Sequence, residues 1–213
     1  MTKKALKTLR DSLLYSILAG IMIGIGGTVN LSCENKVVGA SLFAVGLLTI
    51  VIFQFFLYTG KVGYAKGWRY IPALVIIWIG NFLGAGFCGI VLKFTKIGPA
   101  LIEKAMILCN NKLSDSPTSV FVLGLFCGLL MYIAVDGYKK RTTNETAQLV
   151  IIFVAVMVFI LSGYEHCVAN MYYFTIGEAW SAQAVIHLLV TTAGNSVGGL
   201  LIPLVEHITK RDK

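Results

Sequence analysis

The chain has few charged residues, and it concentrates them in short segments. Only 13% of its 213 residues are charged, whereas 57% are hydrophobic. Soluble globular domains carry about 25% charged residues. Six stretches contain no Asp, Glu, Lys or Arg: 12–33, 37–60, 70–92, 116–135, 146–164 and 179–205. Each is about as long as a membrane-spanning helix requires, so the composition predicts an all-α membrane protein with six transmembrane helices.

Features that mark enzymes and metalloproteins are also missing. The five cysteines form no Cys-x-x-Cys pair and show no metal-ligand spacing. The sequence contains no phosphate-binding loop and no recognisable nucleophile–base pair. We therefore predict that the protein is not an enzyme and has no cofactor or metal. No small-residue cleavage site follows a short apolar core near the N-terminus, so residues 12–33 are expected to be a retained span.

The net charge of +8 is explained by membrane topology rather than by a nucleic-acid site. With six spans and both termini in the cytoplasm, only five of the 18 basic residues lie outside: Lys36, Lys93, Lys96, Lys104 and Lys112. The cytoplasmic ones are Lys3, Lys4, Lys7, Arg10, Lys61, Lys66, Arg69, Lys139, Lys140, Arg141, Lys210, Arg211 and Lys213. This asymmetry follows the positive-inside rule. It predicts a multi-pass protein of the inner (plasma) membrane, with the lipid bilayer and no nucleic acid as partner.

Two adjacent ionisable residues lie inside an apolar segment. Between residues 146 and 177, Glu165 and His166 are the only ionisable groups apart from tyrosines and one cysteine. Ionisable groups at membrane depth mark ion or proton pathways by default. A straight helix over this segment would extend about 48 Å, against a hydrocarbon core of roughly 30 Å. The segment therefore predicts a broken helix beside a transport pathway.

An internal repeat relates the two halves of the chain. Residues 80–85 read Gly-Asn-Phe-Leu-Gly-Ala, and residues 194–199 read Gly-Asn-Ser-Val-Gly-Gly. Each follows a polar interruption, which is Thr59-Gly60 in the first half and 166–170 in the second. Two three-helix halves of opposite orientation, each with an interrupted helix, are typical of inverted repeats with a site near the midplane.

The repeat predicts a single transmembrane channel domain over residues 1–213. Its expected parts are a basic cytoplasmic N-terminus (1–11), two three-helix repeats (12–92 and 116–206), an extracytoplasmic connection (93–115) and a cytoplasmic tail (207–213). The second and fifth helices are expected to be broken.

These motifs resemble the formate/nitrite transporter family. Residues 162–171, which read Ser-Gly-Tyr-Glu-His-Cys-Val-Ala-Asn-Met, resemble the family's fifth-span motif. Residues 57–60 resemble its second-span loop, and Gly80-Asn81 and residues 192–199 resemble its third- and sixth-span motifs. The resemblance covers nearly the whole chain. It implies an aquaporin-like fold, a homopentamer with one pore per protomer, and small monovalent weak-acid anions such as formate, nitrite, hydrosulfide or lactate as substrates.

The resemblance also assigns expected roles to individual residues. His166 would exchange a proton with the anion near the midplane, because the unperturbed pKa of histidine, about 6.5, suits this exchange. Thr59 would present its hydroxyl opposite His166, and Leu57 and Tyr58 would line an apolar constriction. A bare anion crosses such a constriction only at a large desolvation cost, which largely vanishes once the anion is protonated.

Polar residues around this site have supporting roles in the same prediction. Lys112 sits where the family carries a lysine in its outer vestibule, and it would attract anions there. Asn170 and Asn195 are expected to satisfy backbone groups freed where the helices break. Glu165 would either tune His166 or pair with backbone donors at the break. His187 is expected to be a packing or interface residue. Two departures from the family pattern are Lys61, where a neutral residue is common, and Gly128, where formate channels carry an asparagine.

Two other classes of function remain as alternatives at this stage. An aquaporin-like pore for small neutral solutes would leave His166 without a task, and the paired Asn-Pro-Ala loops that it predicts are absent from the sequence. A membrane scaffold or membrane-embedded enzyme is disfavoured by the buried Glu-His pair and by the missing catalytic motifs. The sequence therefore favours a channel or proton-coupled transporter for a small anion that is neutralised near His166.

Overall fold

The computed structural model describes the backbone of residues 3–65 and 67–209, and the side chains from residue 9 onward within these ranges. The predicted cytoplasmic residues Lys66, Lys210, Arg211 and Lys213, and the side chains of Lys3, Lys4 and Lys7, lie outside the described part. All regular elements of the described residues are helical. They are α1 (Lys3–Ser32), α2 (Lys36–Ile52), α3 (Tyr58–Lys61), η1 (Val62–Tyr64), η2 (Trp68–Tyr70), α4 (Ile71–Lys93), α5 (Gly98–Leu113), α6 (Pro117–Asp136), η3 (Gly137–Arg141, a π turn), α7 (Glu145–Leu161), α8 (Cys167–Ile176) and α9 (Ala182–Ile208).

Four helical segments are long and apolar enough to cross a membrane. They are Leu9–Ser32, Trp68–Lys93, Pro117–Arg141 and Ala182–Ile208, with 24 to 27 residues each. The apolar helices α2 and α7 have 17 residues each, which extend over only about 26 Å. Large apolar side chains stay exposed along these helices, among them Phe87, Val154 and Leu189. This distribution is that of an integral membrane protein whose apolar surface is solvated by lipid or by other subunits.

The chain leaves the helical conformation at two equivalent places. After α2, Gln54 has a φ of 57°, and after α7, Gly163 has a φ of 69°. One residue later in each half, a backbone N–H returns to the end of the preceding helix, from Phe55 to Ile50 and from Tyr164 to Phe159, both at 2.9 Å. Both helices therefore end in the same left-handed turn.

The first break lies before the position that the sequence predicted, whereas the second lies at the Glu165-His166 pair, as expected. Thr59 and Gly60 lie inside α3, and Asn170 lies inside α8, so none of them interrupts a helix. The non-helical residues of the first half are 53–57, which are mostly aromatic and apolar. In the second half the non-helical residues are 162–166, which include Glu165 and His166, so polarity indicated that break but not the first one.

Glycines allow the paired long helices to touch through their backbones. α4 packs on α1, and α9 packs on α6. A Cβ on Gly84 would collide with the carbonyl of Ile17 in α1, and a Cβ on Gly198 would collide with the carbonyl of Leu125 in α6. Gly128, where formate channels are expected to carry an asparagine, leaves no room for a side chain against the backbone of Asn195. These small residues permit the close helix approach that is common in membranes.

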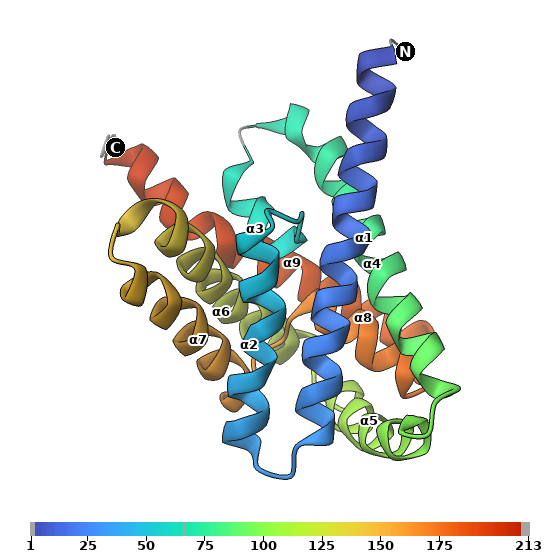
Figure 1. Cartoon of the computed structure of the whole chain (residues 1–213). Coiled ribbons are helices and arrows are strands. Elements are labelled where there is room, and N and C mark those ends of the chain that lie inside the picture. Colours follow the sequence, from blue (N-terminus) through green and yellow to red (C-terminus); the bar gives the residue numbers. More distant parts are fainter. Residues whose placement is uncertain (1–2, 66, 210–213) are drawn as a thin grey trace.

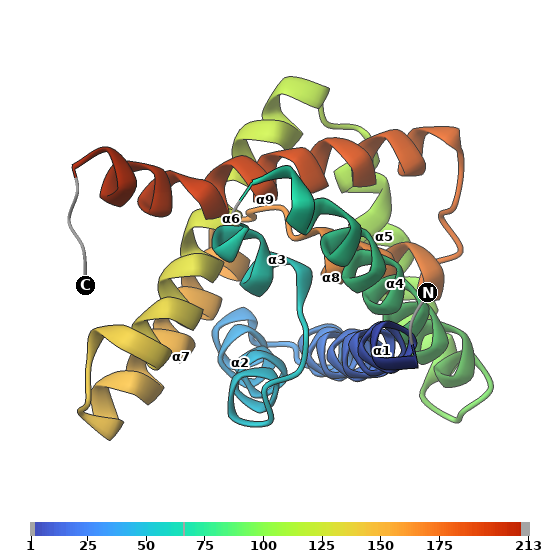
Figure 2. The same ribbon diagram turned by 90° about the horizontal axis from the view of Figure 1, so that it is seen from above.

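The two halves run in opposite directions (Figure 1). The start of α1, the end of α9, η2 and η3 lie at the top of this view, whereas α5 lies at the bottom. α1 descends from the top and its counterpart α6 rises towards it. From above, α3 lies between α2 and α9 (Figure 2). The predicted connection 93–115 contains α5, a 16-residue helix that the charge pattern did not reveal.

Candidate functional site

Two buried asparagines hold the chain where α3 and α8 begin. In the first half, Asn81 Oδ1 accepts the N–H of Tyr58 at 2.8 Å, and Asn81 Nδ2 donates to the carbonyls of Phe56 and Ser16, both at 2.8 Å. Asn81 is 0% exposed. Because unpaired backbone groups at membrane depth cost several kcal/mol each, one amide side chain stabilises both the break and its contact with α1.

Asn195 makes the same three bonds in the second half. Its Oδ1 accepts the N–H of Cys167 at 2.9 Å, and its Nδ2 donates to the carbonyls of Glu165 and Gly124, both at 2.8 Å. The correspondence with Asn81 pairs Tyr58 with Cys167 and therefore Leu57 with His166. The repeat inferred from the Gly-Asn motifs is thus visible bond by bond.

Asn170 does not have the role that the sequence predicted for it, and Asn81 has a role in the site that the sequence analysis did not predict. The Nδ2 of Asn170 donates to the side chains of Glu165 and Thr191, so it satisfies no backbone group at the break. Its Oδ1 is buried without a hydrogen-bond partner among the described residues. Asn81 occupies the same position in its motif as Asn195, and that equivalence in the sequence was the signal that could have identified it.

His166 is held in a single tautomer by the start of α8. Its Nδ1 accepts the backbone N–H of Ala169 at 3.1 Å, and a backbone amide can only donate. The Nε2 of a neutral ring must therefore carry the hydrogen. This N–H points to Thr59 Oγ1, which lies 3.0 Å away. His166 is 2% exposed, and the ring of Phe159 lies 5.7 Å from its ring.

Thr59 brings the first half of the chain to the same point. Its hydroxyl oxygen accepts from His166, and no other hydrogen bond of this side chain is present within the described residues. The hydroxyl hydrogen is consequently available to a ligand, although Thr59 is 0% exposed in the resting structure. The two breaks thus converge on one donor pair at the junction of α3 and α8.

Glu165 is the centre of a buried polar cluster. Its Oε1 accepts from Lys112 Nζ at 2.8 Å, and its Oε2 accepts from Asn170 Nδ2 at 2.7 Å and contacts His187 Nε2 at 3.2 Å. The Glu165 and Lys112 side chains are only 6% and 13% exposed. A buried carboxylate at this depth is stabilised by just such paired donors.

This cluster corrects one expectation, the pairing of Glu165 with backbone donors at the break. Glu165 neither bonds to His166 nor uses its carboxylate for the backbone donors at the break; it binds Lys112, Asn170 and His187 instead. His187 was expected to be a packing or interface residue; it is buried in α9, and its partner is Glu165. Contacts between positions 22 and 53 residues apart depend on helix packing, so local spacing could not reveal them.

The predicted constriction residues lie at the first break. Leu57 is 1% exposed and lines a small pocket together with Gly60, Lys61, Val135 and Lys139. Tyr58 is 9% exposed, and its hydroxyl lies 2.8 Å from Ser196 Oγ. Because Ser196 donates its own hydrogen to the Thr192 carbonyl, the Tyr58 hydroxyl is the donor in this bond. The ring is therefore tied to α9.

The groups at this site can bind a small anion but are not arranged to hold a metal. No group of three or more His, Cys, Asp or Glu side chains suited to a metal ion occurs in the described part of the chain. The uncommitted Thr59 hydroxyl and the His166 N–H are hydrogen-bond donors, and an anionic oxygen accepts from such groups. The site has the chemistry of small-anion recognition.

Known proteins are similar to this chain in sequence and in fold. A sequence model described as formate/nitrite transporter matches residues 1–208. The formate channel FocA of Haemophilus influenzae is 25% identical, over 78% of this chain and 71% of its own length. The nitrite transporter NirC of Salmonella typhimurium is 26% identical, over 87% of this chain and 78% of its own length.

A solved structure extends the similarity to the whole fold. A protein described as a pentameric formate channel with formate bound superimposes with a TM-score of 0.82 at 22% identity, covering 97% of this chain and 99% of that one. The family predicted from the motifs is therefore confirmed, and the sequence match, which extends over nearly the complete chain, shows that this protein belongs to the formate/nitrite transporter family.

Proposed function

We propose that the protein is a channel or proton-coupled transporter for a small monovalent weak-acid anion, either formate, nitrite or hydrosulfide. The observation that carries this proposal is the hydrogen bond between His166 Nε2 and Thr59 Oγ1, formed where the two breaks meet. Relatives described as formate channels and nitrite transporters support the substrate class. The choice among these anions depends on the width of the open pathway.

Protonation of the anion lowers the barrier to crossing the apolar residues near Leu57 and Phe159. Moving a bare ion into a low-dielectric medium costs on the order of tens of kcal/mol. Protonating a weak acid costs only about 1.4 kcal/mol for each unit by which the pH exceeds its pKa. For an acid whose pKa lies a few units below the pH, the neutral form is therefore the cheaper species to move. The constriction then favours weak acids over permanently charged anions.

The resting geometry makes His166 a hydrogen-bond donor. A second proton on Nδ1 would require the loss of the bond from Ala169, which begins α8. The ring therefore donates its Nε2–H to Thr59 Oγ1 and leaves the Thr59 hydroxyl hydrogen to the substrate. In this proposal the proton that neutralises the anion arrives from water at the mouth, which differs from the sequence-based expectation that His166 exchanges it.

In the membrane, we place six spans in an aquaporin-like inverted repeat within a single domain. The four long helices form the first, third, fourth and sixth spans, and α2 with α3 and α7 with α8 form broken second and fifth spans. The segments η2, which contains Arg69, and η3, which contains Lys139–Arg141, lie at the same end as the start of α1 and the end of α9 (Figure 1). This arrangement supports cytoplasmic termini.

We assign the protein to the inner (plasma) membrane as a homopentamer with one pore per protomer. The assembly is proposed because the structurally similar formate channel is described as pentameric. The exposed apolar side chains on the outer helices provide surfaces for lipid and for neighbouring subunits. Protons and the anion are the expected transported partners.

Uptake into proteoliposomes tests the proposal. Vesicles with the wild-type protein should swell in formate or nitrite salts and remain impermeable to neutral osmolytes such as glycerol. Thr59→Val removes the hydroxyl and should reduce anion uptake roughly 5- to 150-fold, the effect of losing about 1–3 kcal/mol of buried hydrogen bonding. Thr59→Ser retains the hydroxyl and should keep most of the activity.

His166→Ala removes the donor ring and should abolish most proton-linked uptake. The exposed His207 at the end of α9 supplies the matched control, because His207→Ala leaves the site untouched. If His166→Ala transports at the wild-type rate, the role of the ring is refuted. Equal permeability to glycerol and formate would instead indicate a pore for neutral solutes.

A further inference from the structure

A buried carboxylate outside the His166 site lies at the inner end of α6, which is the end of the molecule where α9 also ends (Figure 1). The Asp136 side chain is only 2% exposed. Its Oδ1 accepts from the Tyr64 hydroxyl at 2.9 Å, and its Oδ2 accepts from Arg141 Nε at 2.7 Å. Lys140 Nζ lies 3.5 Å from Oδ1 and 4.4 Å from the centre of the Tyr64 ring. The carboxylate therefore joins η1 to η3.

The turn after α6 makes this arrangement possible. Residues 137–141 form a π turn, in which the backbone hydrogen bonds run between residues five apart. Arg141, five residues after Asp136, consequently lies on the same side as the carboxylate, whereas an α-helix aligns residues three and four apart. The Arg141 guanidinium also donates to Glu206 on α9. We name the five connected side chains the inner clasp: Tyr64, Asp136, Lys140, Arg141 and Glu206.

Burial explains why the inner clasp contains cations. Asp136 lies within an apolar segment long enough to cross a membrane, and a carboxylate there is costly unless it is paired. Arginine suits this position because its planar group can donate to two carboxylates at once, as Arg141 does to Asp136 and Glu206. A hydrogen bond that a hydroxyl donates to a carboxylate is also stronger than one between neutral groups. Asp136 is therefore a strong acceptor for Tyr64.

Tyr64 ends the segment that carries the predicted constriction. Residues 53–57 are not helical, and α3 and η1 add only four and three residues. Such short helical pieces have little stability of their own, so side chains must fix their position. Asn81 binds the segment at its start, and Asp136 binds it at its end. The counterpart α8 has ten residues, all of them buried, so the first half depends more on these side-chain bonds.

The segment has no room to move towards α6 or α9. α3 packs on α6, and η1 packs on α9. The pocket beside Leu57 and Val135 has a volume of about 10 Å³, whereas one water requires roughly 10–15 Å³. A Cβ on Gly63 would collide with the ring of Tyr132 in α6 and with the carbonyl of Gly199 in α9. A displaced segment must therefore carry Leu57 away from α6, which widens the gap.

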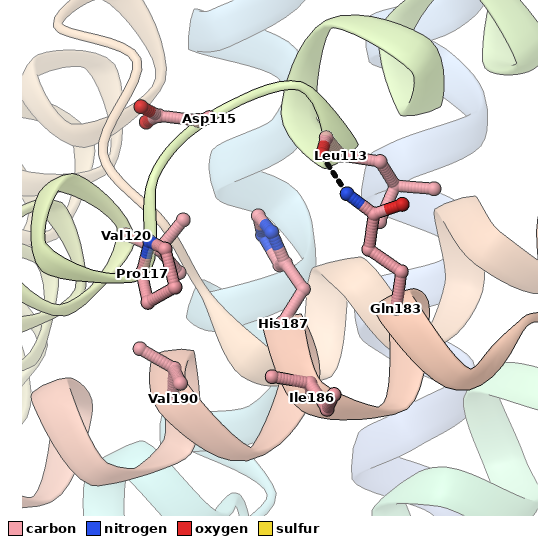
Figure 3. Close-up of a pocket in the computed structure, with 8 residues that line it drawn as sticks. All are labelled: Leu113, Asp115, Pro117, Val120, Gln183, Ile186, His187 and Val190. Atoms are coloured by element: carbon pink, nitrogen blue, oxygen red, sulfur yellow. Dashed lines mark hydrogen bonds between the residues drawn. The ribbon is translucent and has the colours of Figure 1, made fainter.

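The outer end of the molecule has more space. Figure 3 shows a second pocket there, between the linker that precedes α6 and the start of α9, with Pro117 and His187 among its lining residues. Its volume is about 80 Å³, so it has room for several waters. The tighter of these two pockets is the one beside Leu57.

We propose that Asp136 is a positioning residue that sets the width of the constriction at Leu57, and thereby selects solutes by size at the inner end of the pathway. The inference rests on the proposed function. Asp136 touches no substrate; it acts through Tyr64, which keeps η1 and the preceding α3 packed against α6 and α9. With the inner clasp intact, the gap at Leu57 admits only very small acids. With the bond to Tyr64 lost, the segment moves away and a larger acid passes.

The experiment compares the uptake of formate and acetate into proteoliposomes, because acetate is a carboxylate with one additional methyl group. Nitrite replaces formate if the wild type transports only nitrite. The acetate-to-formate ratio of initial rates is compared between variants, so differences in substrate pKa and in the amount of protein cancel. Tyr64→Phe keeps the ring and removes the hydroxyl. A hydrogen bond to a charged group contributes a factor of roughly 10–150 to an equilibrium, so the ratio should rise severalfold, with this factor as the upper limit.

Two further variants test the same reasoning. Arg141→Lys keeps the positive charge but cannot donate to both carboxylates in the same way, so it should raise the ratio less than Tyr64→Phe does. Tyr138→Phe is the matched control, because it removes a hydroxyl from the π turn and leaves the bond between Tyr64 and Asp136 in place. Its ratio should equal that of the wild type.

The ratio separates selection by size from a loss of stability. A variant that merely folds less well takes up both acids more slowly by the same factor, and its ratio stays at the wild-type value. An unchanged ratio in Tyr64→Phe, or in Arg141→Lys if Tyr64→Phe does not assemble, would overturn the role of Asp136 while leaving the proposed function intact. An equal rise in Tyr138→Phe would overturn that role as well. A wild-type protein that takes up neither formate nor nitrite would overturn both proposals.

Discussion

The buried pair of Lys112 and Glu165 leads to a quantitative prediction about the stability of the protein. Lys112→Met removes the ammonium and leaves the Glu165 carboxylate, 6% exposed, without its 2.8 Å partner. Breaking a buried pair from one side costs about 3–5 kcal/mol. Asn170 and His187 still donate to the remaining oxygen, so we expect the lower end of this range, about 3 kcal/mol.

A double variant separates pairing from simple loss of packing. Lys112→Met combined with Glu165→Gln removes both charges, and the amide oxygen of the new glutamine can still accept from Asn170 and His187. The double variant should therefore be more stable than Lys112→Met alone, because no uncompensated charge remains. The pair of Lys93 and Glu178 is the matched control: its side chains are 20% and 62% exposed, and Lys93→Met should cost only about 0–1 kcal/mol.

The measurement is the thermal unfolding of the purified protein in detergent. The fraction of protein that stays assembled is recorded as the temperature rises, and its midpoint is compared between variants. For a chain of this size a loss of 3 kcal/mol lowers the midpoint by about 6–12 °C. If Lys112→Met and Lys93→Met shift the midpoint equally, or if the double variant is as unstable as the sum of its single variants, the charge pairing at Glu165 does not act as the structure indicates.

Two further predictions concern the framework of the site. Asn81→Leu leaves the Tyr58 N–H and the Phe56 carbonyl unpaired, and Asn195→Leu does the same to the Cys167 N–H and the Glu165 carbonyl. Each variant should therefore lower the unfolding midpoint by the equivalent of several kcal/mol. Midpoints near wild type would show that water replaces the amides. Gly84→Ala places a methyl group against the Ile17 carbonyl and should cost about 1–3 kcal/mol, whereas Gly86→Ala, whose nearest neighbour would be 4.0 Å away, should be neutral or slightly stabilising. A similar midpoint for the two glycine variants would contradict the close α1–α4 contact.

Much of the architecture was predictable because lipid imposes simple rules on a sequence. Long charge-free stretches and the distribution of lysine and arginine depend on local composition. The Gly-Asn motifs also indicated the repeat, since small residues are required wherever two helix backbones meet. The convergence of Thr59 and His166 was likewise expected, although only from the family resemblance and not from spacing.

The position of the first break and the partners of Glu165 were not predictable in this way. A left-handed turn at Gln54 has no strong local signal, because glycine and asparagine are the residues that favour a positive φ. Helix α5 was missed because its charged residues resemble a solvated loop. Lys112 and His187 reach Glu165 from helices distant in the sequence, so their roles follow from packing.

The sequence by itself determined that this protein is a membrane-embedded repeat with an ionisable pair inside it, because burial of charge in lipid is costly whatever the fold. Only the tertiary structure decided what each member of that pair does. The start of α8 directs His166 towards Thr59 in α3, whereas packing of α5 and α9 around the second break directs Glu165 away from it, towards Lys112 and His187. Adjacent residues extend in different directions, and their partners are set by whichever helices lie on each side.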